Sequence, residues 1–421
     1  MKMVLKWGRG EVSLQVPDRN VLAVLEPSGG EPVKDLGAAV RSLLGKPTAG
    51  PSLEELARKL RPRSAAVIVN DMTRSTPSSE MLPPVLDELH RLGIPGDRVS
   101  VVVATGTHRP MTDGETRTVV GDDVFGRYRV ENHDCDAPDL VEMGVLSTGN
   151  RFLVNRTVAE ADLRIAIGEV LLHYYAGFAG GRKSILPGVA GRETVMANHR
   201  MMTSDGVGIG VVDGNVLSGE MTEAVERFCP LHFILNCVSD SSKHIVRVVG
   251  GHFLDAWKEG IATFRRYNFA PVPRRADVVF LSAGGFPKDI NMYQAHKALY
   301  MASRAVRPGG TLVFFAELEE GYGHPVFERW AKKDLGPRGA MEAFEKDFQF
   351  GAHKLFYLAK LAAECTVLLV SRASREDSRL MFCEKADRPE DILPALAARY
   401  GEDFTSYVIP QGGIVLPVVE G

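Results

Sequence analysis

Residues 65–104 read AAVIVNDMTRSTPSSEMLPPVLDELHRLGIPGDRVSVVVA, and they contain the pattern from which we predict the fold. Two short runs rich in Val, Ile and Ala, at 65–70 and 99–104, enclose a helical pattern at 80–92. A strand, a helix and a second strand in this order predict a βαβ unit with parallel strands, which need covering helices on both faces. Residues 163–167 predict another buried strand.

A second alternation of strands and helices begins after residue 276. The expected elements are a strand at 277–282, a helix at 293–306, a Pro-Gly-Gly turn at 308–310, and strands at 311–315 and 366–371. The basic, Pro-bearing stretch 268–276 is predicted to be a linker, because X-Pro steps resist helix and charges resist burial. A chain of 421 residues also exceeds the size at which single cores usually stop growing. We therefore predict two α/β domains with mostly parallel sheets, 1–270 and 271–421, and an active site in the cleft between them.

The composition excludes several classes of protein. Fifty basic and 53 acidic residues give a net charge of -3, so no global field would hold nucleic acid or an anionic membrane. The first ten residues lack the apolar core of a signal peptide and no long apolar run occurs, which predicts a cytoplasmic protein that does not enter membranes. The five cysteines form no CxxC pair, so a metal site would depend on histidine.

Polar loops follow four of the predicted strands. They cover residues 71–77, 105–112, 168–173 and 284–291. In open parallel sheets the carboxyl ends of the strands face the ligand crevice. The sequence therefore predicts one shared site, partly between the domains.

The most informative segment is GEVLLHYYAGFAGGRKSILPG at 168–188. Gly177, Gly180 and Gly181 permit close backbone approach and exposed N–H groups, which suit a phosphate. Lys183 is either a nucleophile with a lowered pKa or a counter-charge for that phosphate, and spacing alone favours the second. The segment matches neither the Walker pattern nor GxGxxG, so an ordinary nucleotide site is only weakly indicated.

Three histidines accompany these loops. His108, in ATGTHRPMT, is placed as a general base would be. His173 is either a second base or a core histidine, and His199 is either a metal ligand or a structural histidine on a helix. Two histidines that face one carbon would suit a racemase, because a racemase handles a proton on each face of its substrate.

Two further segments could bind an anion. Thr73, Arg74 and Ser75 precede a predicted helix start, where they form either an anion site or an N-cap with a surface arginine. Tyr293 and Lys297 lie four residues apart and therefore share a helix face. Lys297 could clamp a carboxylate there.

Four motifs in the order NDMTRSTPS, ATGTHRPMT, GEVLLHYYAGFAGGRKSILPG and GGFPKDINMYQAHKAL together resemble the lactate racemase family. The resemblance runs from Asp71 to residue 417. It implies a nickel-pincer nucleotide, which is pyridinium-3-thioamide-5-thiocarboxylic acid mononucleotide with nickel, covalently attached to Lys183 through a thioamide. It also implies His199 as the protein's nickel ligand, and cofactor-maturation proteins as partners.

The resemblance further implies that His108 and His173 are the paired acid and base while hydride moves between the cofactor and C2 of a small 2-hydroxy acid. The 1–270 domain would then bind the cofactor and carry catalysis, and the 271–421 domain would contribute substrate-binding residues. The implied cofactor-binding residues besides Lys183 are Asp71, Thr73, Ser75, Gly177, Gly180 and Gly181. The implied substrate-binding residues are Arg74, Tyr293, Gln294 and Lys297.

One departure bears on the substrate. Lactate-specific members of the family carry a tryptophan late in the second domain, whereas this chain reads DFQFGAH at 347–353, so the expected substrates include a different or larger 2-hydroxy acid. The alternative function is a phosphate- or nucleotide-binding α/β protein without redox chemistry. A third, a histidine-ligated hydrolase, lacks an HExxH or similar pair.

Overall fold

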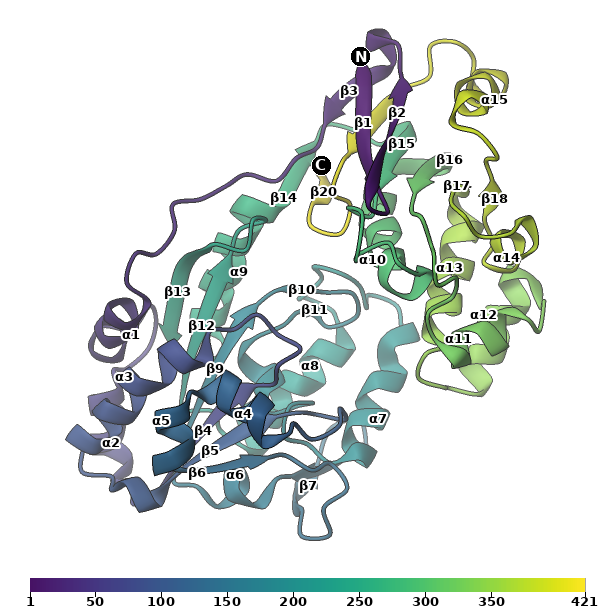
Figure 1. Cartoon of the computed structure of the whole chain (residues 1–421). Helices are drawn as coiled ribbons and strands as arrows, with labels where there is room; N and C mark the ends of the chain where they lie inside the picture. The colour runs from purple at the N-terminus through teal and green to yellow at the C-terminus, as the bar shows by residue number, and fades with distance from the viewer. Residues whose placement is uncertain (421) are drawn as a thin grey trace. The chain divides into compact units, whose positions relative to one another are not determined.

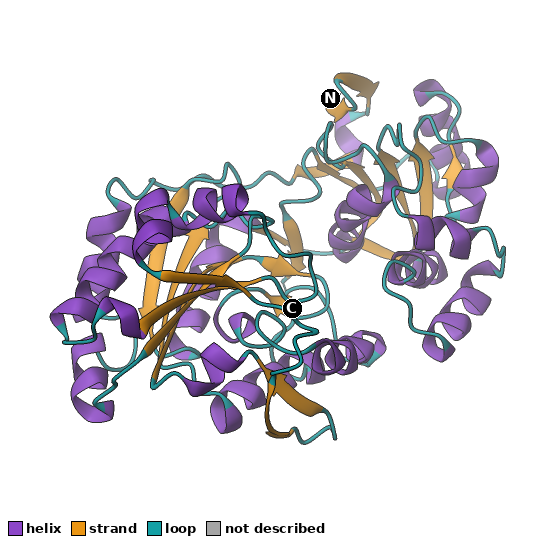
Figure 2. Ribbon diagram, turned by 60° about the horizontal axis from the view of Figure 1, so that its bottom comes forward, coloured by secondary structure: helices purple, strands orange, loops and turns teal. Residues whose placement is uncertain are grey.

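The computed structural model describes residues 1–420 and divides into two compact units. One unit comprises residues 29–267, and the other combines residues 1–28 with residues 268–421 (Figure 1). Each unit contains a six-stranded sheet accompanied by helices (Figure 2). The predicted fold class, two α/β domains with mostly parallel sheets, is confirmed.

The sheet of the 29–267 unit has the strand order β13-β12-β9-β4-β5-β6. Its strands are β4 (Ala65–Asn70), β5 (Val99–Ala104), β6 (Arg129–Asn132), β9 (Leu163–Val170), β12 (Phe233–Ser239) and β13 (Ile245–Gly251). All neighbours are parallel except β12 and β13, which pair antiparallel at one edge. The predicted strands 65–70 and 99–104 match β4 and β5, and the strand predicted at 163–167 continues to Val170.

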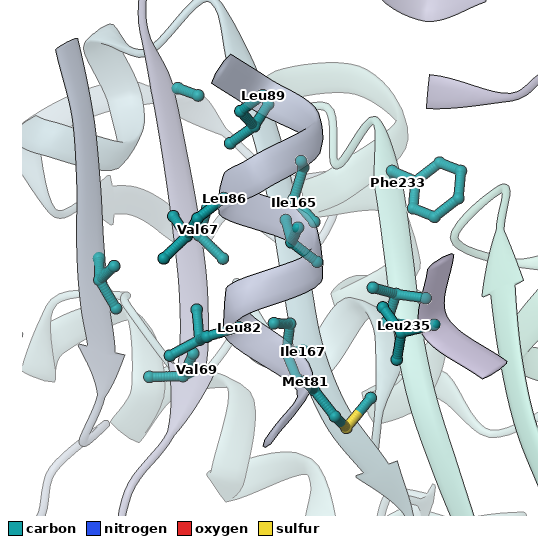
Figure 3. Close-up of a cluster of buried hydrophobic side chains, with 14 of the residues drawn as sticks. Val67, Val69, Met81, Leu82, Leu86, Leu89, Ile165, Ile167, Phe233 and Leu235 are labelled. Carbon is teal, nitrogen blue, oxygen red and sulfur yellow. The ribbon is translucent and has the colours of Figure 1, made fainter. Parts of the chain in front are cut away.

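The helices of this unit are α1 (Leu36–Gly45), α2 (Leu53–Leu60), α3 (Ser78–Arg91), α4 (Asp113–Val120), α5 (Asp122–Arg127), α6 (Arg156–Glu160), α7 (Arg192–Arg200), α8 (Val216–Glu223) and α9 (Asp255–Asn268). Helix α3 packs its apolar face on the central strands, with Leu86 beside Val67 and Ile165 and Leu82 beside Val69 (Figure 3). Burying each such side chain contributes roughly 1.5–3 kcal/mol. This packing fixes the sheet whose carboxyl edge carries the polar loops.

The other unit has a fully parallel sheet with the order β18-β17-β16-β15-β19-β3. Its strands are β3 (Val21–Val24), β15 (Ala276–Ser282), β16 (Val306–Phe315), β17 (Thr366–Val370), β18 (Glu384–Lys385) and β19 (Ser406–Ile409). The helices are α10 (Met292–Ala302), α11 (Pro325–Ala331), α12 (Gly336–Lys346), α13 (His353–Glu364), α14 (Arg375–Leu380) and α15 (Ile392–Tyr400). Strands β1 (Lys2–Trp7) and β2 (Gly10–Gln15) form a hairpin.

Three expectations about boundaries need correction. Residues 1–28 do not belong to the first domain: β3 extends the second sheet by pairing with β19, and the Asn20 side chain donates to the carbonyl of Phe404. The expected linker contains β14 (Phe269–Val272), which pairs with β20 (Leu416–Val419); a two-stranded ribbon tolerates its proline. The helix predicted to reach 306 ends at Ala302, and β16 begins at Val306 and runs through the predicted Pro-Gly-Gly turn.

Within residues 1–420, no helix is long and apolar enough to cross a membrane.

Candidate active site

The carboxyl ends of β4 and β5 carry a hydrogen-bonded carboxylate–imidazole pair. Asp71 directly follows β4, and His108 lies in the loop after β5. Asp71 Oδ2 is 2.6 Å from His108 Nδ1, while Asp71 Oδ1 accepts from the Thr73 hydroxyl at 2.6 Å. The Asp71 side chain is only 6% exposed, whereas the imidazole is 51% exposed. The imidazole therefore projects outward from a buried carboxylate.

The charge of Asp71 sets the tautomer of His108. Burial raises the pKa of the Asp71 carboxyl, but hydrogen bonds from His108 and Thr73 outweigh it and the net pKa is lowered. An ionised carboxylate only accepts, so His108 Nδ1 donates and Nε2 carries the lone pair of the neutral ring. Both Asp71 oxygens are engaged, which favours a role in orienting His108 over the cofactor contact expected from the sequence.

The charge of Arg74 acts both on this pair and on the glycine-rich segment. Thr73, Arg74 and Ser75 are exposed in the loop between β4 and α3. The positive charge of Arg74 contributes to the lowered pKa of Asp71 and also to that of Lys183. The guanidinium therefore lies within electrostatic range of both groups.

A buried tyrosine brings three of the predicted residues together. Tyr175 lies in the turn between β10 (Leu172–His173) and β11 (Gly177–Phe178), and it is 5% exposed. Its ring centroid is 4.2 Å from that of His173 and 5.0 Å from that of His199, both in edge-on geometry. The Lys183 Nζ lies 5.7 Å from the same centroid. We call Tyr175 and these three residues the Tyr175 cluster.

His199 is held on α7 in the state that a metal ligand requires. The side chain is buried, and burial together with the charge of Lys183 lowers its pKa to about 3. The imidazole is therefore neutral at physiological pH. Its Nδ1 is fully buried and makes no hydrogen bond of ordinary geometry among residues 1–420, although the backbone of Val195 on the same helix lies near enough to act on the pKa of the imidazole. The helix is fixed nearby, because the Asn198 side chain donates to the buried carboxylate of Glu220 at 2.7 Å.

Lys183 lies in a short 3-10 turn, η3 (Gly181–Ser184), that follows the glycines. Burial and the charges of Arg74 and Arg182 lower the pKa of its ammonium well below the ordinary value. Among the described residues of the 29–267 unit, Lys183 forms no ion pair with a carboxylate, and its side chain remains partly exposed. An amine in these surroundings has the properties of a nucleophile.

Arg182 supplies one of those charges, and its burial could not be predicted from the motif. It is 1% exposed, its guanidinium lies 3.8 Å from the Trp257 ring centroid, and it donates to the Ser218 hydroxyl. Burial lowers the pKa of Arg182 to about 9, and its Nη1 has no partner among residues 1–420. A buried cation held by neutral groups therefore stands next to Lys183 in the chain.

The three glycines are required by the packing of the chain itself. Gly177, Gly180 and Gly181 all have positive φ values. A Cβ at Gly177 would lie 2.0 Å from the carbonyl oxygen of Val211. The N–H of Gly181 donates to the Asn236 side chain at 2.9 Å. The expectation that these N–H groups are exposed to a phosphate is therefore wrong for Gly181, which weakens the simple phosphate cradle of the alternative function.

The remaining predicted residues lie on α10 in the other unit. Gln294 is exposed, and Tyr293 stacks on His324 with centroids 4.9 Å apart. The Lys354 Nζ lies 4.8 Å from the Tyr293 ring. Burial and the charge of Lys297 lower the pKa of Lys354 to about 7. Helix α10 thus presents Tyr293 and Lys297 beside a second lysine that the sequence analysis missed.

A separate cavity of about 520 Å³ lies at the opposite, amino-terminal edge of β4, β5 and β6. Its wall includes Arg156, which pairs with Asp139 at 3.2 Å. None of the predicted site residues lines it. The chemistry therefore concentrates at the carboxyl edge.

Comparison with known families agrees with this geometry. Residues 7–210 match the lactate racemase N-terminal domain, and residues 272–417 match the lactate racemase C-terminal domain. The chain belongs to the lactate racemase family. It is accordingly an isomerase, as the resemblance predicted.

Curated relatives and solved structures extend the match over the whole chain. Proteins named lactate racemase from Thermoanaerobacterium thermosaccharolyticum and Lactiplantibacillus plantarum are each 32% identical to it; the alignments cover 98% of this chain and 98% of the first relative, and 77% and 76% for the second. The structure of the lactate racemase apoprotein from T. thermosaccharolyticum superposes with a TM-score of 0.87 at 28% identity, covering 99% of this chain and all of that one. A Thermotoga maritima protein, at 19% identity and a TM-score of 0.64 over 93% of this chain and all of that one, shares the fold.

Proposed function

We propose that the protein is a racemase or epimerase that inverts C2 of a small 2-hydroxy acid, with a nickel-pincer nucleotide on Lys183 and with His108 and His173 as acid and base. The observation that carries the proposal is the Tyr175 cluster, where a nucleophilic lysine, a neutral buried imidazole and a second histidine surround one aromatic ring. The curated relatives named lactate racemase support the substrate class.

The residues present fit the implied cofactor. Lys183 has the lowered pKa that covalent attachment of its amine needs, and the unpartnered, buried Nδ1 of His199 marks an imidazole available to a metal. Lys183 would hold the nucleotide and His199 the nickel. When bound, the group would supply a reversible acceptor for the hydride of C2. The protein would supply binding, orientation and proton transfer.

The two catalytic histidines are held in different ways. The Asp71 carboxylate fixes the Nδ1 proton of His108 and leaves Nε2 as the base. The Nδ1 of His173 instead accepts from the backbone N–H of Ala176 at 3.3 Å, so in the neutral ring Nε2 carries the proton. One imidazole is thus set to take the hydroxyl proton and the other to return one. Inversion needs both roles on opposite faces of C2.

The substrate carboxylate and hydroxyl are assigned to Arg74, Gln294 and Lys297, with Tyr293 lining the site. Residues 347–353 contain no tryptophan, and His353 lies 6.1 Å from Tyr293, centroid to centroid. A substrate side chain larger than the methyl group of lactate is therefore included in the proposal.

The test is chiral chromatography of a panel of 2-hydroxy acids incubated with protein produced together with the cofactor-maturation proteins. We expect inversion at C2 of at least one acid, one nickel per chain, and a covalent adduct that peptide mass mapping places at Lys183. Full racemisation by protein that carries neither adduct nor nickel would reject the proposal. Tight binding of common mononucleotides without inversion would favour the alternative function.

A further inference from the structure

The unloaded protein offers an amine with unusual surroundings. Lys183 is partly exposed, forms no ion pair with a carboxylate among the described residues of its unit, and stands beside the ring of Tyr175. Lys332, by contrast, is exposed and forms an ion pair with Glu328. The Lys183 amine is thus accessible and lacks the anion that would keep it protonated.

The charges around this amine favour a particular electrophile. The positive charges of Arg74 and Arg182 both lower the pKa of Lys183. Arg74 is exposed at the same edge of the sheet. Two cations near a neutral amine attract an anion to it. A small carboxylic acid with a carbonyl next to its carboxylate would therefore meet a nucleophile and a counter-charge together.

We propose that Lys183, in protein that lacks its cofactor, captures 2-keto acids as a reversible imine. The inference rests on the proposed function for the class of acid that reaches this site, because a 2-keto acid is the oxidised form of a 2-hydroxy acid. The unloaded enzyme is then a carbonyl-binding protein, and the keto acid competes with loading of Lys183.

The chemistry balances without a further reactant. The Lys183 nitrogen forms a bond to the carbonyl carbon, and the electron pair of the carbonyl π bond moves to oxygen. The nitrogen gives up two protons, and the oxygen leaves with both as water. Arg74 holds the carboxylate throughout, which places the carbonyl carbon near the amine. Lysines held in low-polarity, cationic surroundings form such imines readily.

The test uses full-length protein made without the maturation proteins, incubated with pyruvate and cyanoborohydride, which reduces an imine to a stable amine. Peptide mass mapping should find one carboxyethyl group at Lys183, formed roughly tenfold or more faster than at surface lysines, because each unit of lowered pKa raises the neutral fraction tenfold. Acetone, which has the ketone but no carboxylate, should label Lys183 far more slowly.

Three variants sharpen the result. Lys183→Arg should lose the label, while Lys258→Arg, at an exposed lysine on α9, should keep it. Arg74→Gln should bring the pyruvate rate down towards the acetone rate. Protein loaded with cofactor should not be labelled at this position, because the amine is already acylated.

Label spread evenly over surface lysines, or equal labelling of Lys183 by pyruvate and acetone, would overturn the inference. Because mapping of the wild-type protein gives the position directly, the result does not depend on how well Lys183→Arg folds. A loaded enzyme that racemises while its unloaded form shows no adduct would reject keto acid capture and leave the proposed function standing.

Discussion

Arg182 and Arg192 lie close together in the chain and in opposite electrical surroundings. Arg192 is 48% exposed and makes three hydrogen bonds to the Asp136 carboxylate, which raise its pKa. Arg182 is buried on Trp257 without a carboxylate, and burial lowers its pKa to about 9. Exposed pairs of the first kind contribute little to stability, whereas a buried unpaired cation is costly.

The difference separates the surface of the unit from the Tyr175 cluster. At the surface, charges are compensated by neighbours. In the cluster, Lys183 has no carboxylate partner among the described residues, and the His199 imidazole is neutral with one unpartnered nitrogen. The adjacent Arg182 also has no carboxylate partner among those residues. The general rule that buried charged groups have partners is broken where function requires it.

The largest effect is expected from His199→Ala. Removing the only buried imidazole on α7 should abolish nickel retention and reduce racemisation to background, while the covalent adduct at Lys183 still forms. Metal analysis and intact mass of the same preparation measure both. His244→Ala, which removes an exposed imidazole 3.5 Å from Asp240, is the matched control and should keep nickel and activity. Nickel retained at wild-type level by His199→Ala would exclude His199 as the ligand.

Asp71→Asn should lower kcat by roughly 10²–10⁴, the usual worth of a positioned general base. In the wild-type protein the Asp71 carboxylate accepts hydrogen bonds from both His108 and Thr73. The asparagine amide has the same shape as the carboxylate, but it no longer fixes the tautomer of His108. Glu115→Gln at the exposed Arg109 pair provides the control and should leave kcat unchanged. Equal, small losses for both variants would contradict the distinction between an orienting and a surface carboxylate.

The sequence predicted the elements that define the site better than the contacts within it. The strand runs 65–70 and 99–104 are continuous and apolar, so their ends, and hence the positions of Asp71 and His108, could be placed in advance. The helix that carries His199 was also expected. The pairing of β3 with β19 could not be, because it joins residues nearly four hundred positions apart through backbone groups that carry no residue signature.

The glycines and the tyrosine show why the site was only partly predictable. A positive φ can serve a ligand or the chain's own packing, and only the structure shows that Val211 fills the space at Gly177. Tyr175 stood inside the most informative motif, yet an aromatic residue after a strand is usually core. Its contacts to His173 and His199 arise from a two-residue strand pair that is too short to give a periodic pattern.

A smaller effect concerns stability and pH. The folded-state pKa of His199 lies at about 3, below its ordinary value of 6.5. Between these two values the imidazole binds a proton in the unfolded chain but not in the folded chain. Stability is therefore lost as pH falls below 6.5, by about 1.4 kcal/mol for each pH unit, or about 2 kcal/mol by about pH 5. Urea unfolding of unloaded protein should show this slope, and His199→Gln should flatten it. An identical slope in both would contradict the burial argument.

The smallest effect returns to the two arginines. Arg182→Met removes the cation next to Lys183 and should raise the pKa of the Lys183 amine, so that acylation of Lys183 by an amine reagent at neutral pH slows by a factor of about two to ten. The methionine can fill the apolar space against Trp257, which limits the loss of packing. Arg192→Met removes an equal charge from a compensated pair and should leave the labelling rate unchanged. If both substitutions slow the reaction equally, net charge controls the reactivity of Lys183. The buried position of Arg182 would then have no special effect on that reactivity.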